Sequence, residues 1–315
     1  MSGKVRVGVV GAGVFGGYHA AKIADLNSAE LTAIYDIDKS RASKLATHHN
    51  TNAANSFDEI IAETDALIIA APASEHFDLA KRAMLRSRHV LVEKPIALST
   101  DEAEELVQIS KAKNVVLQVG HQERFVCQSA GLLPLQGEPF RIDCVREVAA
   151  TGRCEDVSVI FDLMIHDIDI VRQMTGADIV RSKVSGDYND VAAELLLENG
   201  AVVTLKASRR SMSPKREIKI TQNSGVISFN FVDHELSVSG AEEMQQRYAE
   251  FDKNSILRDP LAHEDNLFIS AVANGERPAV TGKEALASVA WAQHIEFKSG
   301  IATMPEQAFA KELQA

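Results

Sequence analysis

Apolar and polar positions along residues 1–120 predict strands that alternate with helices. Short continuous apolar runs have the length of strands buried on both faces. Between these runs, apolar residues recur at spacings of three and four, as on one side of an amphipathic helix. The expected strands lie at 5–10, 30–36, 66–72, 89–95 and 114–120. This alternation predicts a parallel, doubly wound sheet that is covered by helices on both faces.

The apolar period changes to two after residue 120. Ile227, Phe229 and Phe231 would point to one side of a strand, with Ser228 and Asn230 on the other. Further strands are expected at 141–149, 192–208 and 216–221, and helices near 260–275 and 282–298. The pattern predicts an open, mostly antiparallel sheet with one packed face and one face free to meet a substrate or another subunit.

A hairpin signal and the length of the chain also support a division into two domains. Asn199-Gly200 interrupts the run 192–208 and is a strong signal for a two-residue hairpin. A chain of 315 residues is longer than one hydrophobic core usually serves. We therefore expect an α/β protein with two domains, 1–120 around the parallel sheet and 121–315 around the antiparallel one.

One segment of the second domain, 156–176, breaks the strand pattern. At helical spacing, polar side chains form a stripe on an otherwise apolar helix, consisting of Asp162, His166, Asp169 and Gln173. Such a helix should be largely buried, so the stripe needs partners or must face a cleft. A satisfied core stripe and a metal site are open alternatives, although no third metal ligand is evident. We favour an active-site stripe, with His166 as a general base and the carboxylate of Asp162 one turn away to orient it.

Composition and charge narrow the class of protein. The net charge of -11 argues against a polyanion such as nucleic acid as the main partner. The only basic cluster, 208–216, is interpreted as a solvated hairpin end. No apolar run approaches the length of a membrane span, and the N-terminal residues enter a strand without room for a signal peptide. Cys127, Cys144 and Cys154 lack metal-ligand spacing and are expected to be reduced thiols in a cytoplasmic protein.

The first strand is followed by glycines at the spacing G-x-G-x-x-G. Gly11 would permit a tight turn, Gly13 would let the backbone approach a pyrophosphate, and Gly16 would let helix and strand pack closely. The next strand ends at Asp36, where a carboxylate can accept hydrogen bonds from a ribose diol. Ile37 follows Asp36, so no arginine there could neutralise the 2'-phosphate of NADP, and NAD is favoured. Lys39 and Arg41 lie nearby in the sequence, so NADP remains an alternative. A Rossmann domain that binds NAD is therefore expected.

Ligands of doubly wound sheets bind at the carboxyl ends of the strands. Ala71 and Pro72 end one expected strand, and Glu93 and Lys94 end another. We expect Lys94 where the reactive end of the cofactor would lie, with Glu93 holding Lys94 or the nicotinamide ribose. A purely structural ion pair between Glu93 and Lys94 is the alternative.

The motifs together resemble the glucose-fructose oxidoreductase and inositol dehydrogenase family (Gfo/Idh/MocA). The resemblance spans nearly the whole chain through "GAGVFG", "EKP", "GHQERF" and "DLMIHDID". It implies a nicotinamide cofactor, a second domain that often builds homodimers or homotetramers, and Lys94, Asp162 and His166 as the catalytic set. Expected cofactor contacts besides those above are Val14, Phe15, His76 and Gln122. Arg124 with Phe125 is expected to hold the second domain to the first, and His121 is a candidate for substrate contact.

Two stretches, "VGHQERF" and "DVSVIFDLMIHDID", are similar to the branch of this family that oxidises UDP-N-acetylglucosamine-type sugars at C3. The expected substrate is thus a small sugar or nucleotide sugar. In the expected mechanism, His166 takes the proton of a ring hydroxyl while hydride leaves for the nicotinamide, and Lys94 polarises the same oxygen. A dehydrogenase of a free sugar or polyol, an NAD-dependent glycosidase and a non-catalytic NAD-binding sensor remain alternatives.

Overall fold

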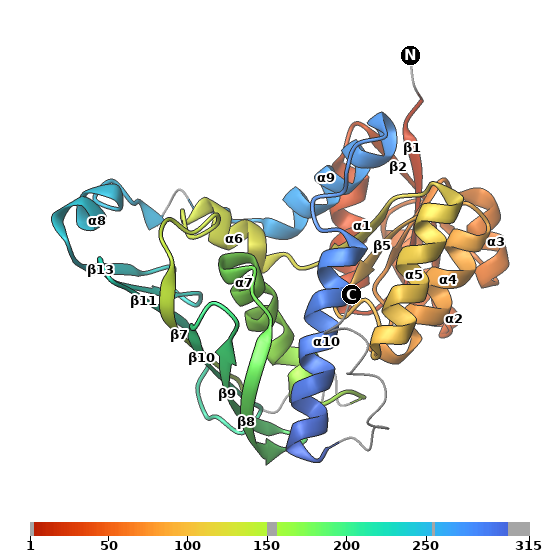
Figure 1. Ribbon diagram of the computed structural model, residues 1–315. Coiled ribbons are helices and arrows are strands. Elements are labelled where there is room, and N and C mark those ends of the chain that lie inside the picture. Colours follow the sequence, from red (N-terminus) through yellow and green to blue (C-terminus); the bar gives the residue numbers. More distant parts are fainter. Residues whose placement is uncertain (1–2, 150–155, 254–255, 302–315) are drawn as a thin grey trace. The chain divides into compact units, whose positions relative to one another are not determined.

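The computed structural model describes residues 3–149, 156–253 and 256–301 (Figure 1). Its first sheet has six parallel strands in the order β3-β2-β1-β4-β5-β6. All five strand pairs in this sheet are parallel. The strands are β1 (Val5–Val10), β2 (Ala29–Tyr35), β3 (Asn52–Ala53), β4 (Ala66–Ile69), β5 (His89–Glu93) and β6 (Leu117–Gly120). The expected parallel, doubly wound sheet is confirmed, and its order reverses between β1 and β4, the position where such sheets bind dinucleotides.

Helices connect these strands because each intervening segment carries one apolar stripe. The helices are α1 (Val14–Asp25), α2 (Lys39–His48), α3 (Phe57–Glu63), α4 (His76–Leu85), α5 (Thr100–Lys113) and α6 (Glu123–Ser129), with a short 3-10 turn at Ala73–Glu75 before α4. On α1, the stripe of Gly16, His19, Ala20 and Ile23 is buried. Its one polar member, His19, is fully enclosed.

The second sheet has seven strands in the order β13-β12-β11-β7-β10-β9-β8. The strands are β7 (Pro139–Glu147), β8 (Ile179–Asp187), β9 (Asp190–Leu197), β10 (Val202–Ser208), β11 (Lys215–Gln222), β12 (Gly225–Asn230) and β13 (Leu236–Gly240). Only β7 and β10 pair in parallel among these described strands, so the expected mostly antiparallel sheet is confirmed. Alternation is clear on β7, where Ile142 and Cys144 are buried and Arg141 is exposed.

Two details of this sheet differ from the sequence prediction. The hairpin at Asn199-Gly200 has three loop residues, because Leu197 pairs with Ala201 and Gly200 adopts φ +83°. A glycine in the left-handed region fits a three-residue turn of this kind. The basic stretch 208–216 is not a hairpin end, since β7 lies between β10 and β11.

The remaining helices are η2, a π-helical turn (Ile160–Met164), followed by α7 (Ile165–Thr175), α8 (Glu242–Arg247), α9 (Pro260–Asn274) and α10 (Gly282–Ser299). Every residue from Ile165 to Val171 is buried, which confirms the expectation of a largely buried helix. In the described ranges, no helix is both long and apolar enough to cross a membrane.

The chain divides into two compact units, of which the first contains Met1–Phe125 with Arg258–Val289 and the second Val126–Leu257 with the segment from Ala290 onward. This division differs from the expected ranges 1–120 and 121–315, because α9 and the first part of α10, up to Val289, cluster with the parallel sheet. Phe268 and Ile269 of α9 share one core with Val5, Ala20 and Ile23. Figure 1 shows α9 beside α1.

Candidate active site

The glycine loop after β1 is built around two close backbone approaches. Gly11 adopts φ +97°, and a Cβ there would lie 2.5 Å from the carbonyl oxygen of Ala70, which follows β4. A Cβ on Gly16 would lie 1.7 Å from the carbonyl oxygen of Gly11. Both glycines are therefore required by the fold itself.

Gly13 differs from the other two glycines. Its φ of -78° suits any residue, and a Cβ there would meet nothing within 4 Å. It precedes the first turn of α1, where amide groups have no partners within the helix and favour an anion. Open space at a glycine in this position fits a bound pyrophosphate, which would need the backbone to be bare. Val14 and Phe15, which follow, are exposed.

Asp36 ties the end of β2 to this loop. Its Oδ2 accepts a hydrogen bond from the Ala12 amide at 2.7 Å, and its Oδ1 accepts one from the Asp38 amide at 2.7 Å. The exposed guanidinium of Arg41 also donates to Oδ1, at 3.1 Å. The carboxylate is thus fixed beside the glycine loop, where it can accept bonds from a ribose diol, and a cation lies next to it.

Glu93 ends β5 and is almost completely buried, whereas Lys94 is half-buried. Oε1 of Glu93 lies 3.0 Å from Nε2 of His19. Burial alone would raise the pKa of Glu93, but the hydrogen bond and charge of His19 outweigh it, so the pKa is lowered and the group is a carboxylate at neutral pH. The carboxylate of Glu93 therefore has a partner behind the strand edge, which the sequence did not reveal.

His76 at the start of α4 is buried and lies between two backbone carbonyls. Its Nδ1 is 2.7 Å from the oxygen of Pro95 and its Nε2 is 2.9 Å from the oxygen of Ala71. The ring thus joins the segment after β4 to the segment that follows Lys94. Pro72, next to Ala71, is exposed. Contact of His76 and Pro72 with the cofactor stays a prediction.

The segment after β6 carries the other expected residues of the first unit. His121 is buried and Gln122 is half-buried. Arg124 forms an ion pair with Glu284 of α10 at 3.4 Å, and the ring of Phe125 meets the ring of His263 of α9 edge-on at 5.1 Å. These recorded partners all belong to the first unit, and a role in holding the second unit stays a prediction.

In the second unit, Asp162 lies on the π-helical turn η2 and His166 on the first turn of α7. Single π-helical turns occur frequently at functional sites, because the extra residue changes which side chains share a face. His166 and Asp169 are buried, while Gln173 at the far end of the stripe is exposed. The polar stripe is thus enclosed over most of its length.

Arg209 is a partner of Asp162 that sequence reasoning missed. Its Nη2 and Nε donate to Oδ2 of Asp162 at 2.9 and 3.2 Å, and Nη2 also donates to the carbonyl of Val157 at 3.0 Å. The interpretation of 208–216 as a solvated segment is wrong for Arg209, which is buried. Arginine beside a carboxylate stabilises its charged form and fixes its orientation.

A second buried pair involves α7, the helix that carries His166. Arg146 of β7 donates from Nη2 and Nε to the two carboxylate oxygens of Asp167 at 2.8 and 3.1 Å. Because both oxygens are engaged by one guanidinium, this pair anchors α7 to the sheet.

The next features are the possible metal ligands and the cysteines. Across 3–149, 156–253 and 256–301, no group of three potential metal ligands occurs. Cys127 and Cys144 are buried and form no disulfide within the described residues, and burial raises the pKa of Cys144 well above its usual value. Cys154 lies outside the described residues.

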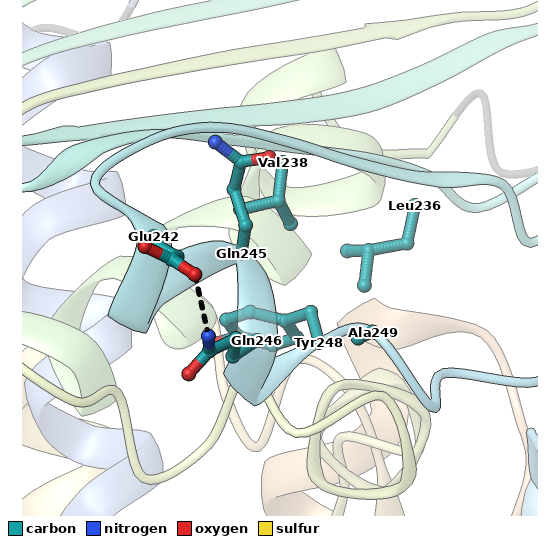
Figure 2. A pocket seen from close by; sticks show the side chains of 7 residues that line it. All are labelled: Leu236, Val238, Glu242, Gln245, Gln246, Tyr248 and Ala249. Atoms are coloured by element: carbon teal, nitrogen blue, oxygen red, sulfur yellow. Dashed lines mark hydrogen bonds between the residues drawn. The ribbon is translucent and has the colours of Figure 1, made fainter.

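A hollow of about 440 Å³ lies beside α8 and β13, away in the sequence from these motifs (Figure 2). Leu236, Val238 and Tyr248 contribute to its lining, and its carboxylate, Glu242, accepts a hydrogen bond from the Gln246 amide at 3.0 Å. These lining side chains offer no base suited to alcohol oxidation near neutral pH.

The parallel sheet, its glycine loop and the fixed Asp36 are the features of a Rossmann domain that binds a dinucleotide. A sequence profile described as "Oxidoreductase family, NAD-binding Rossmann fold" (GFO_IDH_MocA) matches residues 5–121. The UDP-N-acetylglucosamine 3-dehydrogenase of Acidithiobacillus ferrooxidans is 33% identical over 307 residues, covering 90% of this chain and 95% of that protein. The chain belongs to the Gfo/Idh/MocA family of NAD-binding oxidoreductases.

A second relative and a solved structure are also similar to this chain. The myo-inositol 2-dehydrogenase of Thermotoga maritima is 24% identical over 307 residues, covering 89% of this chain and 92% of that protein. A solved structure of the Acidithiobacillus ferrooxidans UDP-N-acetylglucosamine 3-dehydrogenase GnnA superposes with a TM-score of 0.82 at 29% identity, over 94% of this chain and 98% of that one. The expected family, fold and enzyme class are confirmed.

Proposed function

We propose that the protein oxidises a ring hydroxyl of a sugar with NAD, at C3 of a UDP-N-acetylhexosamine. The observation that carries the proposal is the arrangement around His166, where Arg209 fixes Asp162 on the π-helical turn that precedes the histidine. Similarity to a UDP-N-acetylglucosamine 3-dehydrogenase at 33% identity over most of both chains supports the substrate class.

The proposed roles follow from the chemistry of the side chains. His166, as a neutral imidazole, accepts the hydroxyl proton of the substrate, and Asp162 orients this histidine or a neighbouring hydroxyl. Lys94 donates a hydrogen bond to the same oxygen and stabilises the charge that develops on it. A bound nicotinamide supplies the acceptor for the hydride. The alcohol thus loses one hydride and one proton and becomes a ketone.

The residues of the first unit fit the dinucleotide. The open space at Gly13 supports a pyrophosphate at the start of α1, and the Asp36 carboxylate beside the glycine loop would accept hydrogen bonds from the ribose. We propose NAD rather than NADP because the carboxylate of Asp36 would repel a 2'-phosphate. Arg41 is the feature that works against this preference.

The proposal also includes a homodimer or homotetramer built on the open face of the second sheet, where Arg141 is exposed, and a cytoplasmic location. Closed symmetric assemblies commonly bury such a face. Light scattering of the purified protein tests the assembly, and a monomer at micromolar concentration would contradict it.

An absorbance assay for NADH tests the proposed substrate. The protein would be incubated with NAD and, in parallel, UDP-N-acetylglucosamine, UDP-N-acetylgalactosamine, free N-acetylglucosamine and myo-inositol. We expect reduction with a UDP-linked sugar. Reduction only with free sugars or inositol would move the substrate to the polyol class, and reducing sugar released without NADH would indicate a glycosidase.

Two substitutions test the roles of the side chains. His166→Asn and Lys94→Met should each lower kcat/KM by about 100- to 10,000-fold, the range for loss of a general base or an electrostatic stabiliser. The exposed His48→Asn and Lys111→Met are matched controls that should leave it unchanged. Full turnover in His166→Asn would remove the histidine from the mechanism.

A further inference from the structure

His19 of α1 lies fully buried between two carboxylates that come from distant parts of the chain. Its Nδ1 is 2.8 Å from Oδ1 of Asp265 on α9, and its Nε2 is 3.0 Å from Oε1 of Glu93 at the end of β5. Neither His19 nor Asp265 has any exposed side-chain surface. The cluster therefore links α1, α9 and the strand that leads to Lys94.

The two short contacts favour a charged His19 ring. A neutral imidazole donates one hydrogen bond and accepts at its other nitrogen, whereas an imidazolium donates two. Two carboxylates at these distances require two N–H donors. Burial alone would lower the pKa of His19, but Asp265 and Glu93 outweigh burial and raise the pKa well above its usual value.

The carboxylate of Glu93 is held from a second side as well. Glu93 pairs with Gly120 across β5 and β6, and a Cβ on Gly120 would lie 2.9 Å from the carboxylate. The carboxylate thus occupies the space that any other residue at 120 would fill. His19 and the bare backbone of Gly120 together fix its position.

A third carboxyl group, Glu264 of α9, completes the cluster. The side chain is fully buried, and neither oxygen has a hydrogen-bond partner in the described part of the chain. Burial and the charge of Glu93 raise the pKa of Glu264 well above its usual value, which favours its neutral form. The Glu264 carbonyl accepts from the buried amide of Gln118 on β6 at 3.1 Å, which ties α9 to the sheet.

We propose that His19 is a positioning residue, which acts as an imidazolium anchored by Asp265 and holds the Glu93 carboxylate ionised and correctly oriented for cofactor binding beside Lys94. This inference rests on the proposed function, because it assigns Glu93 to the site of the nicotinamide half. It adds α9 to the elements that shape that site, although α9 lies more than 160 residues beyond Lys94 in the sequence.

A purely structural role for His19 predicts different behaviour. If the cluster only stabilised the fold, every substitution would act in proportion to the stability lost. If His19 orients Glu93 and keeps it ionised, losing the hydrogen bond from Nε2 to Glu93 should affect the site differently from losing the bond from Nδ1 to Asp265. The ionisable groups that surround Glu93 are His19 of α1, Lys94 at its own strand end, His76 of α4, and Glu264 and Asp265 of α9.

Two substitutions separate orientation from charge. In His19→Gln the amide nitrogen can occupy the position of Nε2 and keep the bond to Glu93. In His19→Asn it can occupy the position of Nδ1 and keep only the bond to Asp265. Both variants lose the positive charge.

We expect kcat/KM at pH 8 to fall by about 10- to 100-fold in His19→Asn, as for a displaced contact in an active site, and by less than about threefold in His19→Gln. NAD affinity, measured by calorimetry from pH 5.5 to 8.5, should stay nearly constant in the unaltered protein. Both variants should bind NAD progressively more weakly as the pH falls, because Glu93 without the imidazolium gains a proton more readily.

A stability-matched control lies at the other end of β5. His89→Ala removes the ring nitrogen that accepts from the Val116 amide at 3.0 Å, far from the cluster. It should lower the melting temperature without introducing a pH dependence in NAD binding. If either His19 variant does not fold, Asp265→Asn offers a milder change that should weaken NAD binding at low pH in the same direction.

Nitrogen-15 NMR of the histidine rings tests the charge state without any reaction. The His19 ring, assigned by its loss in His19→Gln, should carry protons on both nitrogens at pH 8. A neutral ring at that pH, or equal losses in both variants with unchanged pH dependence, would overturn the inference. Failure of the unaltered protein to bind NAD would instead overturn the proposed function, and with it the role of Glu93.

Discussion

The Arg209 guanidinium donates two hydrogen bonds to a single carboxylate oxygen of Asp162, from Nη2 at 2.9 Å and from Nε at 3.2 Å. The other oxygen of Asp162 is thereby oriented by a rigid, buried donor pair. Since Asp162 lies one helical turn before His166, this arrangement connects the end of β10 to the proposed base.

Arg209→Met should lower kcat/KM by about 10- to 100-fold, because Asp162 loses the donors that fix its geometry. It should also lower the free energy of unfolding by on the order of 3 kcal/mol, since a largely buried carboxylate loses two hydrogen bonds to a charged donor. Steady-state kinetics and urea unfolding measure the two effects. The adjacent Arg210→Met is a matched control, because Arg210 pairs with Asp187 on the surface and such pairs contribute little. Equal effects of both substitutions would contradict the assignment.

Gly13 and Gly16 should respond differently to alanine. Gly13→Ala should fold with an unchanged melting temperature and lose at least about tenfold in NAD affinity, because the new methyl group occupies space that the fold leaves open for the pyrophosphate. Gly16→Ala should lose stability, because its Cβ would overlap the Gly11 carbonyl. Differential scanning fluorimetry and calorimetry distinguish the two cases. Normal NAD binding by Gly13→Ala would show that the loop does not hold the cofactor as proposed.

Asp36 and Arg41 should set the cofactor preference in opposite directions. Asp36→Asn keeps an acceptor for the Ala12 amide but removes the charge, so NAD affinity should fall by roughly tenfold while NADP affinity rises. Arg41→Ala should weaken NADP more than NAD. Dissociation constants of both cofactors for the three proteins check this. An unchanged NAD to NADP ratio in Asp36→Asn would show that Asp36 does not contact the ribose.

Glu264 should make the protein less stable as the pH rises. Its folded-state pKa lies above its unfolded value near 4.5, so the folded protein binds a proton that the unfolded chain releases. The resulting penalty is absent below pH 4.5 and grows by up to about 1.4 kcal/mol per pH unit until the folded pKa is reached. Glu264→Gln should therefore match the unaltered protein near pH 4 and be more stable at pH 8.

The pKa of His19 is also raised in the folded protein. Both Glu264→Gln and the unaltered protein should therefore lose stability from this histidine as the pH rises above about 6.5. The difference between Glu264→Gln and the unaltered protein isolates the glutamate. Urea unfolding at pH 4, 6 and 8 measures it. A difference that does not change with pH would show that Glu264 is ionised in the folded state.

Local patterns were sufficient for the parallel sheet, its glycine loop and the buried helix that carries His166, because each of these depends on residues a few positions apart. Strands β8 and β13 were missed, since both are edge strands whose side chains are mostly polar or exposed. Edge strands bury little surface and therefore leave only a weak apolar period.

The partners of the site residues could not be obtained from the same patterns. His19 and Asp265 are separated by 246 positions, and Asp162 and Arg209 by 47. Nothing in a run such as 208–216 distinguishes a buried arginine from a solvated one until the fold brings a carboxylate to it. For His19, the available signal was its position on the face of α1 that also carries Gly16, Ala20 and Ile23.

The placement of α9 has a consequence for biosynthesis. The core of the nucleotide-binding unit contains Phe268 and Ile269, so it cannot close until the ribosome has translated the whole intervening segment 126–257. The nascent N-terminal strands must wait with apolar surface uncovered, and the inserted unit can fold before the unit that encloses it in the sequence. A fragment that stops at Phe125 would lack α9, which packs against α1, and would be prone to aggregate.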